Sequence, residues 1–212
     1  MRPGKFKDSL NVPTVSIPLD LRHNKRVMKK PEHPDLLYRA RAFDMAALAE
    51  IYDQYSPSLH AYALRLLGDE MQAEDCVGEV FSRLLKALKA GQGPHDHLQA
   101  YLYRVAHNWI TDTYRRQPPP ELELPETFPE DERLQPEKGA QQRSQQDRIR
   151  AALRLLPPEQ RQVVALRFLE DYSNEEVAAA MNKTEGAVKA MQHRAMASLK
   201  KLLGLEAFDE QQ

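Results

Sequence analysis

The chain is poor in cysteine, glycine and aromatic residues. Among its 212 residues the one cysteine is Cys76, which excludes an internal disulfide and leaves no cysteine-based zinc site. Eight glycines and an aromatic content of 7%, beside abundant alanine, leucine and glutamate, favour helices over sheets. No apolar run approaches the roughly 18 residues of a membrane-spanning helix and no signal peptide is recognisable, so the sequence predicts a soluble, cytoplasmic protein. The formal net charge of −1 means that any nucleic-acid binding would depend on local basic patches.

Three segments lack helical patterning and are predicted to lie outside the folded domains. Residues 1–35 combine basic residues and prolines without sustained periodicity, which predicts a basic flexible N-terminal extension, and Met28 is an alternative start. Residues 117–140 are rich in proline and acidic residues, which predicts a stiff, self-repelling linker. Residues 205–212 form a C-terminal tail.

Residues 36–116 carry the signals of a domain of amphipathic helices. The predicted segments are 43–55, 56–68, 69–89 and 98–116. Ser56-Pro57 predicts the start of the second segment, because serine caps a helix and proline is tolerated in its first turn, and Gly68 ends it. The third segment directs one apolar face toward a core: Cys76, Val77, Val80, Phe81, Leu84, Leu85 and Leu88.

Residues 141–204 predict a second helical domain that ends in a helix-turn-helix. Ser173 and Glu176 have the spacing of a capping box, in which each side chain satisfies a free backbone amide. The short helix that follows is broken at 182–184, and a longer helix runs from Glu185 to about Leu203. The predicted fold class is therefore all-α, with two helical domains joined by the acidic, proline-rich linker.

The last predicted helix has two chemically different faces. At about 100° per residue its apolar residues fall within roughly 80° of one another, and these are Val188, Met191, Ala195, Leu199 and Leu202. The opposite side carries small or cationic residues: Gly186, Lys189, Ala190, His193, Arg194 and Ala197. Such a helix can pack by one face and enter the DNA major groove by the other. Taken alone, the pattern is equally compatible with an amphipathic surface helix that binds nothing.

Longer motifs in both domains resemble a known family. The second domain carries Leu155-Leu156-Pro157-Pro158-Glu159-Gln160-Arg161, Leu166-Arg167-Phe168-Leu169-Glu170-Asp171 and Gly186-Ala187-Val188-Lys189. The first domain carries Ala73-Glu74-Asp75, Glu79-Val80-Phe81 and Tyr101-Leu102-Tyr103-Arg104-Val105-Ala106-His107-Asn108. The two sets resemble regions 4 and 2 of bacterial sigma factors, and most closely those of the extracytoplasmic-function (ECF) group.

The resemblance implies a subunit without catalytic activity that joins core RNA polymerase and directs promoter-specific transcription initiation. Region 2 would bind the polymerase clamp and melt the minus-ten element, and region 4 would dock on the polymerase flap and read the minus-thirty-five element. The clamp-binding positions of the family match Asp75, Glu79 and Arg83, which share one helix face by their spacing. Gly78 stands where the family usually has glutamine. A glycine within a helix costs about 1 kcal/mol relative to alanine, so its presence predicts either a close approach or a lost polar contact at this position.

The resemblance also implies two sets of DNA contacts. The set for the minus-ten element is Arg104, His107, Asn108, Asp112, Arg115 and Arg116, with Trp109 assigned to the core. His107 replaces the arginine common in the family, so its charge is expected to change near pH ~6.5. The set for the minus-thirty-five element is Lys183, Thr184, Glu185, Gly186, Lys189, His193 and Arg194.

Two other classes of function fit the sequence less well. A helix-turn-helix regulator would sense a ligand or dimerise through its first domain, but no effector pocket is recognisable there. An enzyme would need a triad, a P-loop or metal-ligand spacing, and the pair His95 and His97 offers too few ligands for a metal site. No cofactor is expected. The expected partners are core RNA polymerase, promoter DNA and an anti-sigma factor, which could hold the chain at a membrane into which it does not itself insert.

Overall fold

The structure is a computed structural model and describes residues 34–120 and 138–204. These residues form helices and no strand, in the order α1 (Pro34–Arg41), α2 (Met45–Leu67), α3 (Glu70–Lys89), α4 (Leu98–Arg116), α5 (Lys138–Leu155), α6 (Pro158–Val164), the π-helix η2 (Ala165–Leu169), α7 (Asn174–Met181) and α8 (Glu185–Leu202). The predicted C-terminal tail, nearly all of the N-terminal extension and residues 121–137 of the predicted linker lie outside the described residues.

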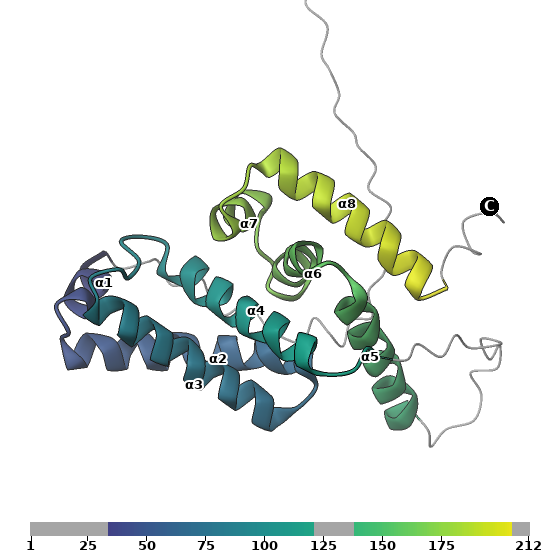
Figure 1. Ribbon diagram of the computed structural model, residues 1–212, viewed down its shortest axis with the longest axis horizontal. Helices are drawn as coiled ribbons and strands as arrows, with labels where there is room; N and C mark the ends of the chain where they lie inside the picture. The colour runs from purple at the N-terminus through teal and green to yellow at the C-terminus, as the bar shows by residue number, and fades with distance from the viewer. Residues whose placement is uncertain (1–33, 121–137, 205–212) are drawn as a thin grey trace, which may run out of the picture.

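Helices α1 to α4 form the first bundle, in which α2, α3 and α4 pack against one another (Figure 1). Its largest fully buried side chains are Ile51, Leu59, Tyr62, Leu66, Val80, Leu84, Leu102, Tyr103 and Ile110. Burial of one such side chain contributes about 1.5–3 kcal/mol relative to its exposure, so these shared apolar faces hold the bundle together. The predicted core face of α3 is confirmed except at Leu85, which is 39% exposed.

The predicted helix boundary at Ser56-Pro57 is wrong, because α2 runs through it without a break. Proline in a helix interior removes one backbone hydrogen bond and costs about 3 kcal/mol. Burial continues on both sides of Pro57, at Tyr55 and Leu59, and this packing offsets the cost. The break lies earlier, at Phe43, whose φ of 61° separates α1 from α2.

Several predicted helix ends are confirmed by their capping contacts. Asp69 accepts a hydrogen bond from the backbone N–H of Gln72 at 2.9 Å and so begins α3. Gly68, with a φ of 73°, ends α2 in the left-handed conformation that glycine adopts most easily. Ser173 and Glu176 form the predicted capping box at the start of α7.

Helices α5 to α8 form the second bundle, and α7 and α8 are the predicted helix-turn-helix. Asn182, with a φ of 53°, ends α7 and begins the turn. Helix α8 packs against α6 and α7, and Val188, Met191 and Ala195 are buried between them. These contacts confirm the apolar stripe predicted for the last helix.

The two bundles pack against each other through α4 with α7 and through α2 with α5. Figure 1 shows α6, α7 and α8 lying above α4, with α5 at its C-terminal end. The buried residues of the two bundles belong to one continuous cluster. The contact also contains the buried polar side chains His107, Thr111 and Arg161. The structure therefore holds the two predicted domains face to face.

Two glycines give opposite expectations for replacement by alanine. Gly78 is exposed within α3 and no other part of the described chain lies within 4 Å of the position of an added Cβ, so packing within the chain does not require glycine there. We expect Gly78→Ala to raise the free energy of unfolding by about 0.5–1 kcal/mol and the Tm by about 2 °C, since alanine loses less conformational entropy in a helix.

Gly68→Ala is the matched control, because Gly68 has a φ of 73° and its Cβ would lie 3.0 Å from the side chain of Arg150. Its Tm should fall in the same thermal denaturation followed by circular dichroism. A rise of the same size in both variants would contradict this account.

Candidate nucleic-acid and polymerase interfaces

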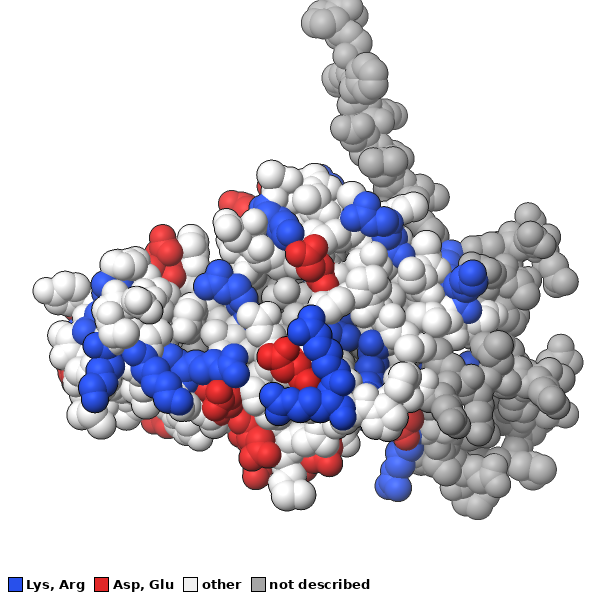
Figure 2. Space-filling view, viewed as in Figure 1, with Lys and Arg blue, Asp and Glu red and all other residues white. Residues whose placement is uncertain are grey.

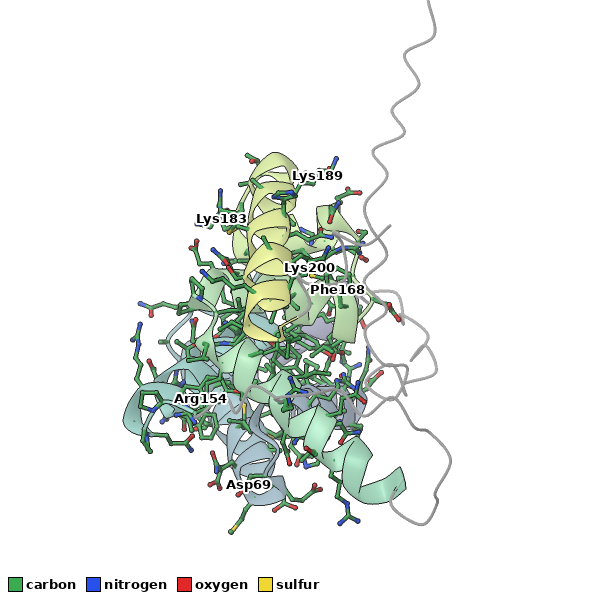
Figure 3. The ribbon with its side chains drawn as sticks, turned by 90° about the vertical axis from the view of Figure 1, so that its right-hand side faces the viewer. Asp69, Arg154, Phe168, Lys183, Lys189 and Lys200 are labelled. Atoms are coloured by element: carbon green, nitrogen blue, oxygen red, sulfur yellow. The ribbon has the colours of Figure 1, made fainter. Side chains whose placement is uncertain are left out.

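Helix α8 presents a largely cationic face to solvent at its N-terminal end. The exposed residues there are Lys183, Thr184, Glu185, Gly186, Lys189, His193 and Arg194. Figure 3 shows Lys183 and Lys189 near this end of α8 and Lys200 nearer the other end. The structure thus brings together on one surface all the residues that the sequence predicted for the minus-thirty-five element.

Three of these residues have surroundings that bear on DNA binding. Thr184 caps α8, since its hydroxyl oxygen accepts from the backbone N–H of Ala187 at 3.2 Å. The Lys183 ammonium lies 2.8 Å from the Glu159 carboxylate, and such exposed pairs contribute at most about 1 kcal/mol, so a phosphate can replace the carboxylate. Near the position of a Cβ on Gly186 the nearest atom is the Thr184 hydroxyl oxygen at 4.0 Å. The helix start is therefore open to an approaching anion.

Helix α4 carries two polar stripes that lie about a quarter turn apart at about 100° per residue. The outward stripe contains the exposed residues Arg104, Asn108 and Arg115, and Asp112 lies 3.4 Å from Arg115. Tyr101 belongs to the same side, and its ring centroid is 5.6 Å from the guanidinium carbon of Arg104. Arg116 is exposed beside this stripe and Trp109 is half-buried. The outward stripe therefore combines cations with an aromatic ring.

The inward stripe of α4 faces the second bundle and consists of Tyr103, His107, Thr111 and Tyr114. The Nε2 of His107 lies 3.0 Å from the Pro158 carbonyl oxygen, and its Nδ1 lies 3.0 Å from the Tyr62 hydroxyl. Because a carbonyl only accepts, Nε2 carries the proton and the tyrosine hydroxyl donates to Nδ1. The predicted DNA contact at His107 is thus covered in this arrangement.

Burial, with a smaller effect from the nearby Arg161 cation, lowers the pKa of His107 from 6.5 to about 3. The expectation that its charge changes near pH ~6.5 is therefore wrong for this arrangement. The ring stays neutral at physiological pH.

His107 makes the stability of this arrangement depend on pH. Its pKa is depressed from 6.5 to about 3, so its stabilisation is complete above pH 6.5 and is lost as the pH falls toward 3. We expect the Tm to fall as the pH is lowered from about 7.5 to about 5.5. His107→Gln should make the Tm less dependent on pH, since glutamine binds no proton. The corresponding free energy of unfolding changes by at most about 1.4 kcal/mol per pH unit.

Glu170 acts in the opposite direction, because burial raises the pKa of its carboxyl and the packed state then takes up a proton on acidification. The difference in Tm between the wild-type chain and His107→Gln at each pH isolates the histidine. The same pH slope in both chains would refute its role.

Glu170, which directly follows η2, connects the second bundle to two helices of the first. Its carboxylate accepts hydrogen bonds from the guanidinium of Arg65 on α2 and, at 3.0 Å, from the hydroxyl of Tyr103 on α4. The side chains of Arg65 and Glu170 are 14% and 6% exposed. Burial raises the pKa of Glu170, while Arg65 and Tyr103 act to lower it.

Arg161 of α6 makes a second polar contact with α4. Its guanidinium donates to the Thr111 hydroxyl at 2.9 Å and to the Arg154 carbonyl at 3.1 Å. The guanidinium carbon also lies 4.7 Å from the ring centroid of Tyr114, within the range of a cation–π contact. Sequence reasoning missed the roles of Arg161 and Glu170 because their partners on the first bundle lie 50 and 105 residues away, beyond any local pattern.

The predicted clamp-binding residues lie on one face of α3. Asp75 is exposed, and Glu79 and Arg83 form an ion pair of 2.8 Å one turn apart, which lowers the pKa of Glu79. Figure 2 shows acidic side chains over the N-terminal half of α3 and basic ones toward its C-terminal end. The sequence did not predict an apolar edge formed by Leu85 of α3 and Tyr52 of α2, which are 39% and 49% exposed.

One group among the described residues has the donor set of a metal site. It consists of His60, Glu70 and Glu74, whose ligand atoms lie within 4.8 Å of one another. Both glutamates are exposed, and the Nε2 of His60 lies 3.3 Å from the Glu70 carboxylate. A contact between the His60 ring and the exposed Glu70 carboxylate accounts for this arrangement, so we assign no metal to it.

Comparison with known proteins places both bundles in one family. A model of sigma-70 region 2 matches residues 51–118, and a model of sigma-70 region 4 matches residues 146–199. The chain is 32% identical over 174 residues to the ECF RNA polymerase sigma factor BldN of Streptomyces coelicolor, covering 80% of this chain but only 65% of that relative. It is 31% identical over 170 residues to the ECF RNA polymerase sigma factor SigX of Bacillus subtilis, covering 76% of this chain and 87% of that relative.

A solved structure supports the fold. CnrH, in complex with the cytosolic domain of CnrY, is similar with a TM-score of 0.60 at 22% identity, over 82% of this chain and 97% of CnrH. No helix within residues 34–120 and 138–204 has the length and apolar character needed to cross a membrane.

The two regional matches fall in chain order on the bundle that contains α3 and α4 and on the bundle that contains α8. The similarity to SigX covers most of both chains. The chain therefore belongs to the ECF family of RNA polymerase sigma factors, the promoter-specificity subunits of transcription initiation, which are not enzymes.

Proposed function

We propose that this chain binds core RNA polymerase and directs it to promoters, with the first bundle melting the minus-ten element and the second reading the minus-thirty-five element. The proposal rests on one observation: each bundle that matches a sigma region has a helix, α4 or α8, with a buried apolar face and an exposed face rich in cations.

The clamp of the polymerase would bind the α3 face formed by Asp75, Glu79 and Arg83. Exposed carboxylates one turn apart can each accept paired hydrogen bonds from arginines of a partner. Glu79 would exchange its exposed pair with Arg83 for such a contact at little cost. The exposed apolar edge at Tyr52 and Leu85 adds surface of the kind that anchors protein interfaces.

The outward stripe of α4 would hold the melted minus-ten element. Arg104, Arg115 and Arg116 can follow the phosphates of a single strand, and Asn108 can hydrogen-bond to an exposed base. Asp112 orients Arg115 through their contact. Tyr101 offers a stacking surface worth roughly 1–3 kcal/mol per base. His107 would join this surface only when the second bundle has moved away from α4.

The exposed face of α8 would enter the major groove at the minus-thirty-five element. Lys189, His193 and Arg194 would contact base edges and phosphates along one helix face. Lys183, Thr184, Glu185 and Gly186 would lie against the phosphate backbone at the helix start, where free amides favour an anion. The polymerase flap would bind the second bundle outside this face.

An anti-sigma factor is a further proposed partner, and membership of the family supports it. Such a protein would restrain the chain by covering one of its functional faces. If the anti-sigma factor were anchored in a membrane, it would hold this chain at the membrane surface. None of the described helices of this chain is long and apolar enough to cross a membrane.

Lys189→Ala and His193→Ala test the assignment of the reading face. We expect each change to weaken holoenzyme binding to a selected promoter by about 5–100-fold, because one lost base contact costs about 1–3 kcal/mol. Binding to core polymerase alone should be unchanged. Gel-shift titration measures the first quantity, and co-purification with core polymerase measures the second.

Lys201→Ala is the control, since this exposed lysine lies at the opposite end of the same helix. It should change promoter binding by less than the other two variants. Equal losses of core-polymerase binding in the Lys189 and His193 variants would argue against the assigned face. Failure of the wild-type chain to co-purify with core polymerase at moderate salt would refute the proposed function itself.

A further inference from the structure

We propose that the free chain closes on itself, with the second bundle held on α4 by a buried latch of Arg65, Tyr103 and Glu170, and that the latch must open before both promoter elements are engaged. The consequence for promoters rests on the proposed function. The closed state itself is a property of the chain alone.

The latch joins three elements that are far apart in the sequence. Glu170, directly after η2, accepts hydrogen bonds from Arg65 of α2 and Tyr103 of α4, so one carboxylate connects the second bundle to two helices of the first. Its side chain is only 6% exposed. Loss of one partner would leave a charged group buried without compensation, which is the costly outcome for such pairs.

A second group of contacts lies along the same side of α4. His107 binds the Pro158 carbonyl oxygen, Arg161 binds the Thr111 hydroxyl, and the Tyr103 and Tyr172 rings lie 5.6 Å apart between their centroids. These polar and aromatic contacts add to the buried apolar cluster that the two bundles share. Polar groups of this kind regain hydrogen bonds to water when they separate, so the contact is specific and also able to open.

The closed arrangement is too short to engage both promoter elements at once. By their names the elements lie about 25 base pairs apart, which is about 85 Å along B-DNA at 3.4 Å per base pair. Helix α4 packs on α7 and α7 packs on α8. Packed helix axes are about 8–10 Å apart, so α4 and α8 are separated by only about 20 Å. One of the two DNA-binding faces must move away from the other.

The chain between the bundles is long enough for this movement. From residue 120 to residue 138 it can extend to at most about 60 Å, so the bundles can separate without unfolding. A tether of this length also gives the bundles an effective concentration in the millimolar range. Even a weak interface is mostly closed under that condition, and a partner that binds both bundles can still open it.

The distance between two spin labels in the full-length free chain tests the latch. Met71→Cys on α3 and Lys201→Cys on α8 place the labels at exposed positions on the two bundles. The native Cys76 is buried and its pKa is raised to about 12, so it will not take a label. We expect one narrow distance distribution in the wild-type background. Glu170→Gln should shift the open-to-closed ratio by about 30-fold or more and give longer, broader distances.

Asp171→Asn is the matched control, because it removes one charge from the next residue, which is exposed and has a φ of 54° that asparagine tolerates. It should leave the distribution narrow. Arg65→Gln should open the chain as Glu170→Gln does, and the double variant should open it no further than either single change. Circular dichroism with an unchanged helical signal separates opening from unfolding.

Addition of core polymerase should lengthen the distance between the labels in the wild-type background. The affinity of the Glu170→Gln variant for core polymerase should be higher by about 10-fold or more, since its open state is already populated. A broad distribution in the free wild-type background, or equal distributions for Glu170→Gln and Asp171→Asn, would overturn the proposal. If the free chains show the expected distances but none of them binds core polymerase, the latch is upheld and the proposed function is refuted.

Discussion

Asp75→Lys combined with Glu79→Lys should abolish binding to core RNA polymerase, with a loss of affinity of about 100-fold or more. Both carboxylates lie on one face of α3, and reversal of their charges would place cations against the arginines expected on the partner. Like charges brought together at an interface cost several kcal/mol. The fold should survive, because only the exposed pair between Glu79 and Arg83 is lost. Titration with labelled core polymerase measures the affinity.

Asp147→Lys on α5 provides the control, since it reverses an exposed charge outside the proposed clamp surface. It should leave the affinity within a few fold of the wild-type value. An unchanged affinity in the α3 double variant would show that the clamp does not bind this face.

Val188→Asp should unfold the helix-turn-helix and eliminate promoter recognition. Val188 is fully buried on α8, which packs against α6 and α7, and an unpaired carboxylate at such a site destabilises by about 3 kcal/mol or more. We expect a Tm lowered by roughly 6 °C or more and a reduced helical signal. Thermal denaturation by circular dichroism provides the measurement.

Ala190→Asp introduces the same side chain two residues later, at an exposed position on the other side of α8. Its Tm should stay close to the wild-type value, while promoter binding should fall because a carboxylate now faces phosphates. Equal losses of stability in the two variants would contradict the assignment of buried and exposed faces.

Features set by local interactions could be predicted from the sequence. The helix start at Asp69 and the capping box at Ser173 depend on contacts within a few residues, and the structure has both. The two faces of α8 follow from a period of 3.6 residues and were predicted on the same basis. The boundary at Pro57 failed because a continuous buried face carries α2 through a residue that usually ends or begins a helix.

Features set by contacts between distant segments could not be predicted. Periodicity places Arg104, Asn108 and His107 on neighbouring parts of α4, but only the packing of the second bundle covers His107 and leaves the other two exposed. The contacts of Glu170 likewise depend on how the bundles meet. These are the positions at which the free chain differs from a simple pair of DNA-binding modules.

Transcription in vitro from fragmented chromosomal DNA of the chain's own host tests the central claim most directly. Purified core polymerase is incubated with and without the full-length chain, and transcript 5′ ends are mapped. The account predicts start sites that require the chain and share a minus-ten and a minus-thirty-five element, with recognition of the latter weakened by Lys189→Ala. A chain that binds duplex DNA but creates no new start site with core polymerase would contradict it.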